Sequence, residues 1–366
     1  MQFVVESTFG VPKKYFLRSA VRIPGTFRRI QERSMVPLLV YCVSGVFYPL
    51  GVAHIEQGVP LSALPGRCQR SDFGAVGSLS RSILSERITV LDLRETPVPD
   101  VIDRCVAALS VDLDIEHPAF GWGGKSMGFG TSRGTWVKIL FRPASQINER
   151  IWTGEECASV LTGVSKPRLL GSVCWLDDAR GLVWRADETT RVEAPAVSST
   201  PEIREEPPGL TVEWWESLRG SLGALAEAKT TRVAVRQDLI SRRVREYAGP
   251  AVDPAVDEWL PAHADVHWAN LTAPRMVLLD WEGWGLGPRG LDGATLWAFS
   301  LLVPAVAGQV ADLFADDLAC RSGALARLFM CVELLRMCRN FGDHPDLAEP
   351  LAREADRLVI ELSARK

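Results

Sequence analysis

The pattern of apolar and polar residues changes near residue 88, and from there the chain divides into distinct elements. Val101–Leu109 carries apolar residues at helical spacing after a proline-rich turn, which predicts a short amphipathic helix. Phe120–Gly130 is glycine-rich and precedes a turn, as is typical of a hairpin. Strands are predicted for the apolar segments Val90–Leu93, Thr135–Phe141, Leu169–Trp175 and Gly181–Ala186.

The second half of the chain has a mainly helical pattern. Thr211–Ala228 begins with a residue type that caps helices and continues with apolar residues at helical spacing. Met276–Leu279 is an exception, because a short, branched and uncharged run is typical of a buried strand. Later segments with i, i+3, i+4 apolar spacing predict further helices, at Thr295–Val303, Val310–Leu318 and Leu325–Cys338.

The first part of the chain is the least regular. Basic residues from Lys13 to Arg33 precede the uncharged run Ser34–Ala53, an order similar to that of a signal-anchor. Prolines and glycines interrupt this run, whereas a spanning helix needs about twenty apolar residues, so we expect no membrane insertion. An extension of strands and turns, or a poorly ordered one, is the alternative. We therefore expect an N-terminal extension (1–87), a small lobe (88–190) and a larger helical lobe (191–366).

Composition and charge indicate a globular protein with two lobes and argue against a nucleic-acid partner. The chain has 366 residues, 47% hydrophobic and 23% charged, which is enough for two lobes that each have a core. The net charge is −4, but residues 1–100 hold twelve Lys/Arg against eight Asp/Glu, so the remainder is acidic. An acidic body does not suit sequence-independent nucleic-acid binding, whereas it suits a cationic small molecule. We expect no nucleic-acid partner.

The eight cysteines are scattered, without a C-x-x-C pair or a cluster at zinc spacing. Neither a disulfide framework nor a zinc site is therefore indicated, and reduced thiols in a cytoplasm are expected. Cys331 and Cys338 lie seven residues apart in an apolar helical pattern, where a free cysteine acts as a small hydrophobe.

The candidate chemistry lies in His263–Leu271 and in Val277–Glu282. Asp265 and Asn270 are five residues apart, which suits a loop whose carboxylate faces a substrate hydroxyl while the amide faces a cation. Asp280 follows the apolar run Met276–Leu279 and can reach the same cation. Taken one at a time, these residues also have a structural interpretation: the two aspartates and the asparagine could cap turns, and the two histidines could be buried and hydrogen-bonded. Together, the spacing favours phosphoryl transfer, and a zinc helix is excluded because Ala264 stands where H-E-x-x-H has Glu.

H-x-D-x-x-x-x-N followed by an apolar strand that ends in D-W-E resembles the aminoglycoside phosphotransferase family of the protein-kinase-like fold. The resemblance covers about residues 95–350. It implies an α+β, two-lobe fold with a small, mostly antiparallel β N-lobe and a larger helical C-lobe. His267 and Trp268 after Asp265, and the lack of D-F-G and A-P-E, favour the branch that acts on small molecules. Family members usually carry Gly where this chain has Ala264, so the chain adds a methyl group beside Asp265.

The small lobe carries the residues that the resemblance assigns to the nucleotide. It implies nucleotide contacts at Gly123, Gly124 and Ser126, since glycine lets backbone N–H groups approach phosphates. Lys138 lies in an apolar strand, where a charge is costly to bury unless it is paired. It resembles the strand-three lysine of kinases, whose partner is a helix glutamate. We favour Glu156, which could instead cap its helix; Glu155 is then the alternative.

The remaining roles also follow from the resemblance. Asp265 would orient and deprotonate the acceptor hydroxyl, Asn270 and Asp280 would hold Mg²⁺, and Asp292 would stabilise the catalytic loop from below. The expected function is ATP- and Mg²⁺-dependent phosphorylation of a hydroxyl on a small molecule: an aminoglycoside-like antibiotic, an amino sugar or a related alcohol. A nucleotide-binding pseudoenzyme that regulates a partner protein is the alternative. The residues leave the acceptor and the oligomeric state open.

Overall fold

The structure, a computed structural model, describes residues 40–43, 46–49 and 91–364, and its contacts divide the chain into two units, Met1–Arg87 and Ile88–Lys366. In the first unit, β1 (Val40–Val43) and β2 (Val46–Pro49) form an antiparallel hairpin. This hairpin lies inside the uncharged run considered as a signal-anchor; the rest of that run is outside the described residues. Among the helices of the described ranges, none has the length and apolarity needed to cross a membrane.

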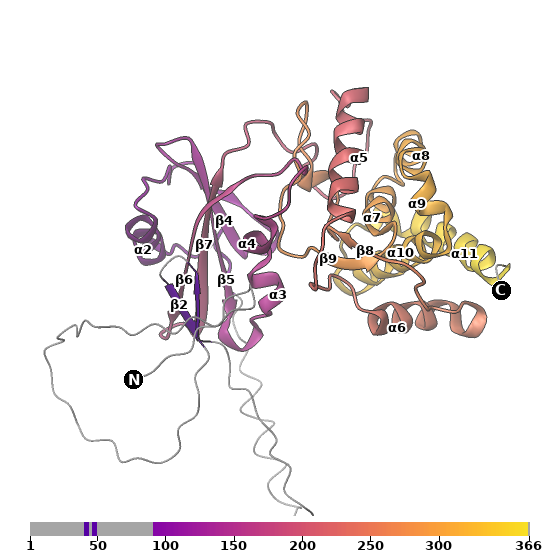
Figure 1. The fold of residues 1–366 in the computed structure, drawn as a ribbon, viewed down its shortest axis with the longest axis horizontal. Coiled ribbons are helices and arrows are strands. Elements are labelled where there is room, and N and C mark those ends of the chain that lie inside the picture. The colour runs from indigo at the N-terminus through magenta and orange to yellow at the C-terminus, as the bar shows by residue number, and fades with distance from the viewer. Residues whose placement is uncertain (1–39, 44–45, 50–90, 365–366) are drawn as a thin grey trace, which may run out of the picture. The chain divides into compact units, whose positions relative to one another are not determined.

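The second unit begins with a lobe built on one antiparallel sheet (Figure 1). The helix predicted at Val101–Leu109 is present as α2 (Pro99–Leu109), which begins two residues earlier with proline at its first position. The strands follow in the spatial order β3-β4-β5-β7-β6, with bounds β3 (Ala119–Phe120), β4 (Ser126–Gly130), β5 (Thr135–Pro143), β6 (Leu169–Asp177) and β7 (Leu182–Thr190). The strand expected at Val90–Leu93 is not seen in its described part. Instead, buried Leu93 donates a single backbone hydrogen bond to Gly124.

The two faces of this sheet have different surroundings. Val137, Ile139 and Phe141 of β5 point into a core that also contains Cys105 of α2. Because side chains alternate along a strand, Lys138 points to the opposite face. Figure 1 shows α2 on one side of the sheet and the short helices α3 (Glu149–Trp152) and α4 (Gly154–Ala158) on the other, next to the helical lobe.

The larger lobe is mainly helical, as predicted. Its elements are α5 (Val212–Ala226), α6 (Gln237–Ala248), β8 (Trp259–Ala262), β9 (Gly285–Pro288), α7 (Leu291–Phe299), α8 (Pro304–Leu313), α9 (Ala315–Ala319), α10 (Arg321–Phe341) and α11 (Ala348–Ala364). Thr211 caps α5, since its side chain accepts a hydrogen bond from the Trp214 N–H. The helix predicted at Val310–Leu318 is divided into α8 and α9 at the buried Phe314.

Three tryptophans connect the helical core to the predicted catalytic loop. Trp214 of α5 stacks on Trp268 with ring centroids 6.3 Å apart, and Trp215 meets Trp268 edge-on. The Trp268 indole is fully buried and donates to the Ser300 hydroxyl at 3.0 Å. Because Trp268 lies between Asp265 and Asn270 in the sequence, this packing fixes the loop on a rigid base.

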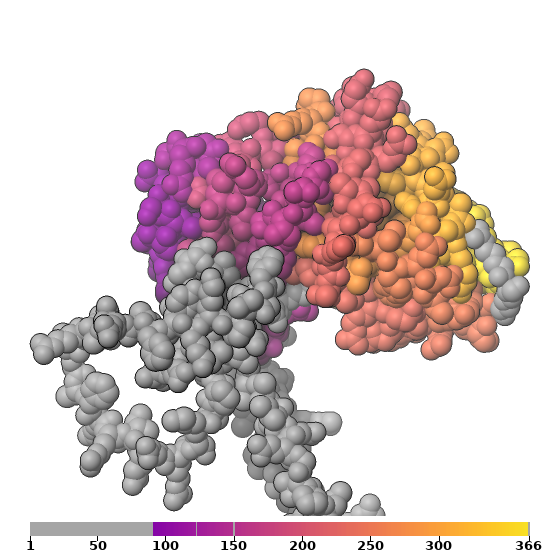
Figure 2. Space-filling model, viewed as in Figure 1, coloured from indigo at the N-terminus to yellow at the C-terminus, as the bar shows by residue number. Residues whose placement is uncertain are grey.

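The two lobes of the second unit meet along a close backbone contact. The Trp284 indole donates to the carbonyl oxygen of Gly154 at 3.0 Å. A Cβ atom on Gly154 would lie 2.3 Å from the carbonyl oxygen of Glu282, so only glycine fits there. In Figure 2 the small lobe, coloured indigo to magenta, and the helical lobe, coloured orange to yellow, adjoin without a gap in this view.

Candidate active site

Asp265 and Asn270 form a hydrogen-bonded loop after β8. The Asn270 Nδ2 group donates to the backbone oxygen of Asp265 at 3.0 Å and to its Oδ2 at 3.1 Å. It also lies 3.2 Å from His267 Nε2, which is in turn 3.6 Å from Asp265 Oδ1. Since the amide nitrogen of Asn270 is engaged with these partners, its amide oxygen is the atom left to meet a cation. The predicted spacing thus brings the carboxylate and the amide together.

The two histidines of the motif are neutral. Burial lowers the pKa of His263 and of His267 to about 4 in each case. His263 Nε2 lies 3.0 Å from the Leu279 carbonyl oxygen, to which it donates, and its ring meets Trp281 edge-on at 4.6 Å. His263 therefore joins the Asp265 loop to the segment that carries Asp280, as a buried hydrogen-bonded histidine.

Asp292 holds the loop from behind, which confirms the expectation drawn from the resemblance. Its carboxylate accepts the backbone N–H groups of His263 and Ala264, both at 2.8 Å. Burial raises the pKa of Asp292 to about 6, although these two hydrogen bonds act in the opposite direction. Ala264 has φ of +66°, in the left-handed region that favours glycine. This backbone geometry explains why glycine suits the position.

Asp280 follows a buried segment, as predicted, although that segment is not part of a sheet. Met276, Val277 and Leu278 are buried, but their only strand-type pairing is one bridge between Leu271 and Leu278. The segment's backbone groups bond to separate loops instead: Leu278 N–H donates to Ser165, and Leu279 N–H donates to Asn270. Asp280 itself has φ of +64°, an uncommon conformation for a non-glycine residue.

Lys138 reaches across from the small lobe to this segment. Its Nζ lies 2.9 Å from Asp280 Oδ1 and 2.7 Å from Glu282 Oε1. Burial lowers the pKa of Lys138, but the two carboxylates outweigh it and hold the pKa well above its usual value. Burial likewise raises the pKa of Asp280, yet Lys138 outweighs it and leaves that pKa below its usual value. The two groups are therefore both charged.

The structure corrects the predicted helix partner of Lys138. Glu156 was favoured, but its carboxylate lies 3.6 Å from Arg185. Glu155 lies on the Lys138 side: it accepts the Trp281 N–H at 3.0 Å and interacts electrostatically with Lys138. Neighbouring residues of a helix point about 100° apart, so only one of the two can face the site. The predicted capping box is also absent, since Thr153 makes no side-chain cap bond to α4.

The site has more carboxylates than cations. Partial burial and, secondarily, repulsion from Asp280 raise the pKa of Asp265 above its usual value, although its side chain is 51% exposed. Burial raises the pKa of Glu155 as well, to about 7, against the attraction of Lys138. With Asp280 and Glu282, four acidic side chains thus surround one lysine. Because a nearby divalent cation would favour the deprotonated forms of Asp265 and Glu155, these raised pKa values fit a site that receives one.

The donor set fits Mg²⁺ bound together with phosphates. Within residues 91–364 and the β1–β2 hairpin, no three His, Cys, Asp or Glu side chains converge as a complete metal site. Mg²⁺ commonly takes only one or two protein oxygens and completes its shell with phosphate oxygens and water. The Asp280 carboxylate and the Asn270 amide oxygen meet that requirement.

The glycine-rich segment is organised mainly by its own neighbours. Gly123 and Gly124 both have φ of +65°, and a Cβ on Gly124 would lie 1.9 Å from Asp92 Oδ1. The Ser126 hydroxyl occupies the space where a Cβ of Gly121 would stand, 2.1 Å away. Gly121 and Gly124 therefore avoid clashes inside the small lobe, whereas a Cβ on Gly123 would meet only the Lys125 side chain, at 3.8 Å. Nucleotide contact by Gly123, Gly124 and Ser126 stays a prediction.

A buried ion pair on β7 was missed in the sequence. Arg185 Nε donates to both carboxylate oxygens of Asp187, at 2.9 and 2.8 Å, and Arg185 Nη1 donates to the Trp152 carbonyl. The side chains of Arg185 and Asp187 are only 4% and 3% exposed. The sequence did contain a signal for this pair: Arg185 and Asp187 are two residues apart, and residues i and i+2 of a strand share a face. Glu282, the second partner of Lys138, was quoted in the motif but given no role.

Solved structures share this fold. The crystal structure of aminoglycoside phosphotransferase APH(4)-Ia matches with a TM-score of 0.50 at 12% identity, over 71% of this chain and 97% of that chain. The apo form of a thermostable mutant of the same protein matches with a TM-score of 0.50 at 14% identity, over 71% and 98%. Amicoumacin kinase hAmiN, in complex with AMP-PNP, Ca²⁺ and Ami, matches with a TM-score of 0.49 at 11% identity, over 74% of this chain and 94% of that chain. No protein-family model and no curated protein sequence matches the chain. The predicted kinase-like fold, an antiparallel five-stranded sheet followed by a helical region, is confirmed.

Proposed function

We propose that this protein is an ATP- and Mg²⁺-dependent phosphotransferase that acts on a hydroxyl group of a small molecule. The observation that carries the proposal is the contact between Lys138 and Asp280, which joins the sheet lobe to the helical lobe at 2.9 Å. This contact lies beside Asp265 and Asn270, whose side chains are hydrogen-bonded to each other. A lysine, two magnesium-type oxygens and a proton acceptor are the protein groups that phosphoryl transfer requires.

Each residue has a distinct part in the proposed reaction. Asp265 accepts a hydrogen bond from the acceptor hydroxyl and takes its proton as the oxygen attacks. Asn270 holds Asp265 in place through its Nδ2 group while its amide oxygen faces the metal. Lys138 is charged and meets the phosphates, with Glu155 behind it. Bound MgATP would supply the transferable phosphoryl group, and its Mg²⁺ ion, held by Asp280 and Asn270, would supply positive charge beside the carboxylates. Positioning and charge neutralisation supply the rate gain.

The proposed acceptor is a small molecule with a hydroxyl and positive charge. The excess of carboxylates at the site and the acidic net charge of residues 101–366 favour such a molecule over an anion. Aminoglycoside-like antibiotics, amino sugars and related alcohols have this chemistry. Among the matched structures, a mutant of APH(4)-Ia is in a ternary complex with ADP and hygromycin B, and another protein is in complex with GDP and kanamycin.

Release of ADP tests the proposal. The protein would be incubated with MgATP and a panel of aminoglycosides, amino sugars, nucleosides and choline-like alcohols, and ATP binding would be measured by calorimetry. We expect ADP release above the water background with at least one acceptor. Asp265→Asn keeps the shape of the side chain but removes its charge, so turnover should fall by about 100-fold or more while ATP affinity changes little.

The outcomes separate the candidate functions. Full turnover by Asp265→Asn would overturn the proposed mechanism. ATP binding without transfer to any acceptor would favour the nucleotide-binding pseudoenzyme, and the absence of ATP binding would exclude both.

A further inference from the structure

The two edges of the small-lobe sheet are protected to different degrees. An edge strand presents backbone N–H and C=O groups to further strands, and proteins usually protect such edges with short strands, prolines or charged side chains. One edge is β3, which has only two residues and follows Pro118. The other is β6, where Leu169–Leu176 contains no charged residue and no proline. Within the described residues β6 pairs with β7 alone, so no strand of that part of the chain covers its outer side.

Exposed leucines lie near both ends of β6. Leu170 is 44% exposed and Leu176 is 52% exposed. A β-bulge shifts the register with β7 between Leu169 and Gly171, which places Leu170 at the bulge. The regular pairing then continues from Gly171 to Asp177, longer than the mean strand of about five to six residues. The bulge therefore does not close this edge to a further strand.

Charges of opposite sign flank the two ends of β6. Arg168 precedes the strand, Asp178 follows it, and both are exposed. Along the ranges that the structure describes, neither side chain has a hydrogen-bond or ion-pair partner. The neighbouring cation, Arg180, is held instead by Asp100 at 2.7 Å and by Asp177 at 2.6 Å. A strand with a positive start and a negative end is complementary to an antiparallel copy of itself.

Pairing of β6 with β6 of a second copy satisfies the leucines and the charges together. In a symmetric antiparallel pair centred on Val173, residues equally far before and after Val173 lie opposite each other. Leu170 then meets Leu176 of the second copy, and Arg168 meets Asp178. We propose that two copies of this protein associate through β6 and form one continuous sheet across a two-fold axis.

The flanking charges select this register. A pair centred on Cys174 would place Arg168 opposite Arg180, and like charges directly opposite each other destabilise a strand pair. A pair centred on Ser172 would place Arg168 opposite Leu176 and leave its charge without a partner. Because one sequence supplies both members of every contact, a second copy fits this edge better than an unrelated strand. A strand pair buries little surface, so the association is weak and concentration-dependent.

Reversal of the flanking charges tests the interface and its register. Arg168→Glu places two acidic side chains opposite each other at both ends of the pair, and Asp178→Arg places two basic ones. We expect the dissociation constant of the dimer to rise by roughly tenfold in each variant, and Arg168→Glu/Asp178→Arg to recover it. Arg219→Glu changes an exposed charge on α5 and should leave association unchanged. Sedimentation velocity of the full chain, from about 1 to 100 µM, measures the association.

The exposed leucines provide a second, matched test. Leu170→Lys/Leu176→Lys places lysines opposite each other and should abolish association, whereas Leu170→Lys/Leu176→Glu pairs opposite charges and should retain it. Val160→Lys is the control, because Val160 is 77% exposed and lies outside β6. Thermal unfolding checks that every variant keeps the parent fold.

Several results would overturn the interface. A parent that stays monomeric over the whole concentration range is one. Parent-like association of folded Arg168→Glu is another, and so is a double charge reversal that associates no better than either single variant. Equal weakening by Arg219→Glu or Val160→Lys would place the contact elsewhere on the molecule. None of these measurements depends on phosphoryl transfer.

Discussion

Two ionic clusters share one face of the sheet, and they are built differently. The Arg185 cluster (Arg185, Asp187, Glu156) is contained in the small lobe, and its central pair is almost fully buried. The Lys138 cluster (Lys138, Asp280, Glu282) joins the lobes, and its side chains are 20–38% exposed. Lys138 and Asp187 are direct cross-strand partners, so the clusters are neighbours.

The clusters differ in how deeply their side chains are buried and in whether they join the two lobes. In the Arg185 cluster, Arg185 Nε donates to both oxygens of Asp187, and both side chains are almost fully buried. In the Lys138 cluster the ammonium lies between Asp280 and Glu282 of the helical lobe, and two further carboxyl groups with raised pKa values, Asp265 and Glu155, lie near it. A buried ion pair within one lobe organises a fold, whereas a partly exposed cluster with carboxyl groups of raised pKa beside it has the properties of a binding site.

The strongest test of this contrast is Asp280→Asn. Removing a magnesium-type ligand should lower turnover by about 100-fold or more, with partial recovery at high Mg²⁺, while thermal stability changes little because Lys138 keeps Glu282. Steady-state ADP release over a magnesium series and a melting curve would check both parts. Asp187→Asn is the control, with the opposite profile of lower stability and retained turnover. Parent-like activity of Asp280→Asn would contradict the assignment.

Arg185→Met should have the largest effect on stability. It leaves the buried Asp187 carboxylate without its partner, and breaking such a pair typically lowers the free energy of unfolding by about 3 kcal/mol. Urea unfolding would measure the loss. Arg185→Met/Asp187→Leu removes both charges and should recover most of it. A loss below about 1 kcal/mol for the single variant would show that the cluster is not structural.

Lys138→Met should act on the nucleotide more than on the fold. The partners of Lys138 stay partly hydrated, so stability should change by about 1 kcal/mol or less. The KM for ATP should rise by roughly tenfold, since a charged contact to phosphate is lost. Arg142→Met is the matched control on the same strand, because Arg142 contacts Glu282 only at 3.7 Å. Equal KM changes in the two variants would remove the special role of Lys138.

Ala264→Gly should have the smallest effect. Glycine relieves the left-handed backbone at φ +66°, but it also gains freedom in the unfolded chain, so a net stabilisation of about 0.5 kcal/mol is expected. Ser110→Gly is the control, because Ser110 has φ of +54° at the end of α2, far from the loop in sequence. Chemical unfolding would compare the two. If Ala264→Gly also changed turnover and Ser110→Gly did not, the strain at Ala264 would be part of the site.

Local signals in the sequence predicted much of this arrangement. Lys138 was identified because a lysine inside an apolar strand needs a partner, and Thr211 because a threonine before a helical pattern caps it. The Asp265–Asn270 spacing predicted a tight loop, and in the structure the two side chains are hydrogen-bonded to each other. In each case the residue type and a few neighbours determine the outcome.

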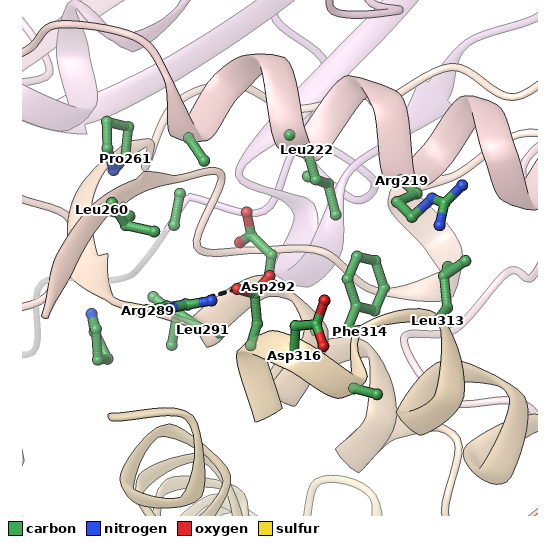
Figure 3. Close-up of a pocket in the computed structure, with 18 of the residues that line it drawn as sticks. Arg219, Leu222, Leu260, Pro261, Arg289, Leu291, Asp292, Leu313, Phe314 and Asp316 are labelled. Carbon is green, nitrogen blue, oxygen red and sulfur yellow. Dashed lines mark hydrogen bonds and ion pairs between the residues drawn. The ribbon is translucent and has the colours of Figure 1, made fainter. Parts of the chain in front are cut away.

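Features that depend on distant segments were not predictable in the same way. Whether Glu155 or Glu156 faces Lys138 depends on the rotation of α4, which the hydrogen bond from Trp284 of the helical lobe to Gly154 of α4 helps to fix. The Met276–Leu279 segment has the composition of a strand, but its backbone partners are loops. A cavity beside Asp292 (Figure 3) is lined by residues from several elements between residues 219 and 317, so no short sequence pattern could predict it.

The Lys138–Asp280 contact also has a consequence for folding. It joins residues 142 positions apart, and contacts of such separation form late because closing a long loop reduces chain entropy before any contact repays it. Each lobe has its own hydrophobic core and can collapse earlier. During refolding, tryptophan burial should therefore precede nucleotide binding, and ATP affinity should appear only when the lobes dock. Nascent chains that end before Asp280 would contain a folded sheet but no site.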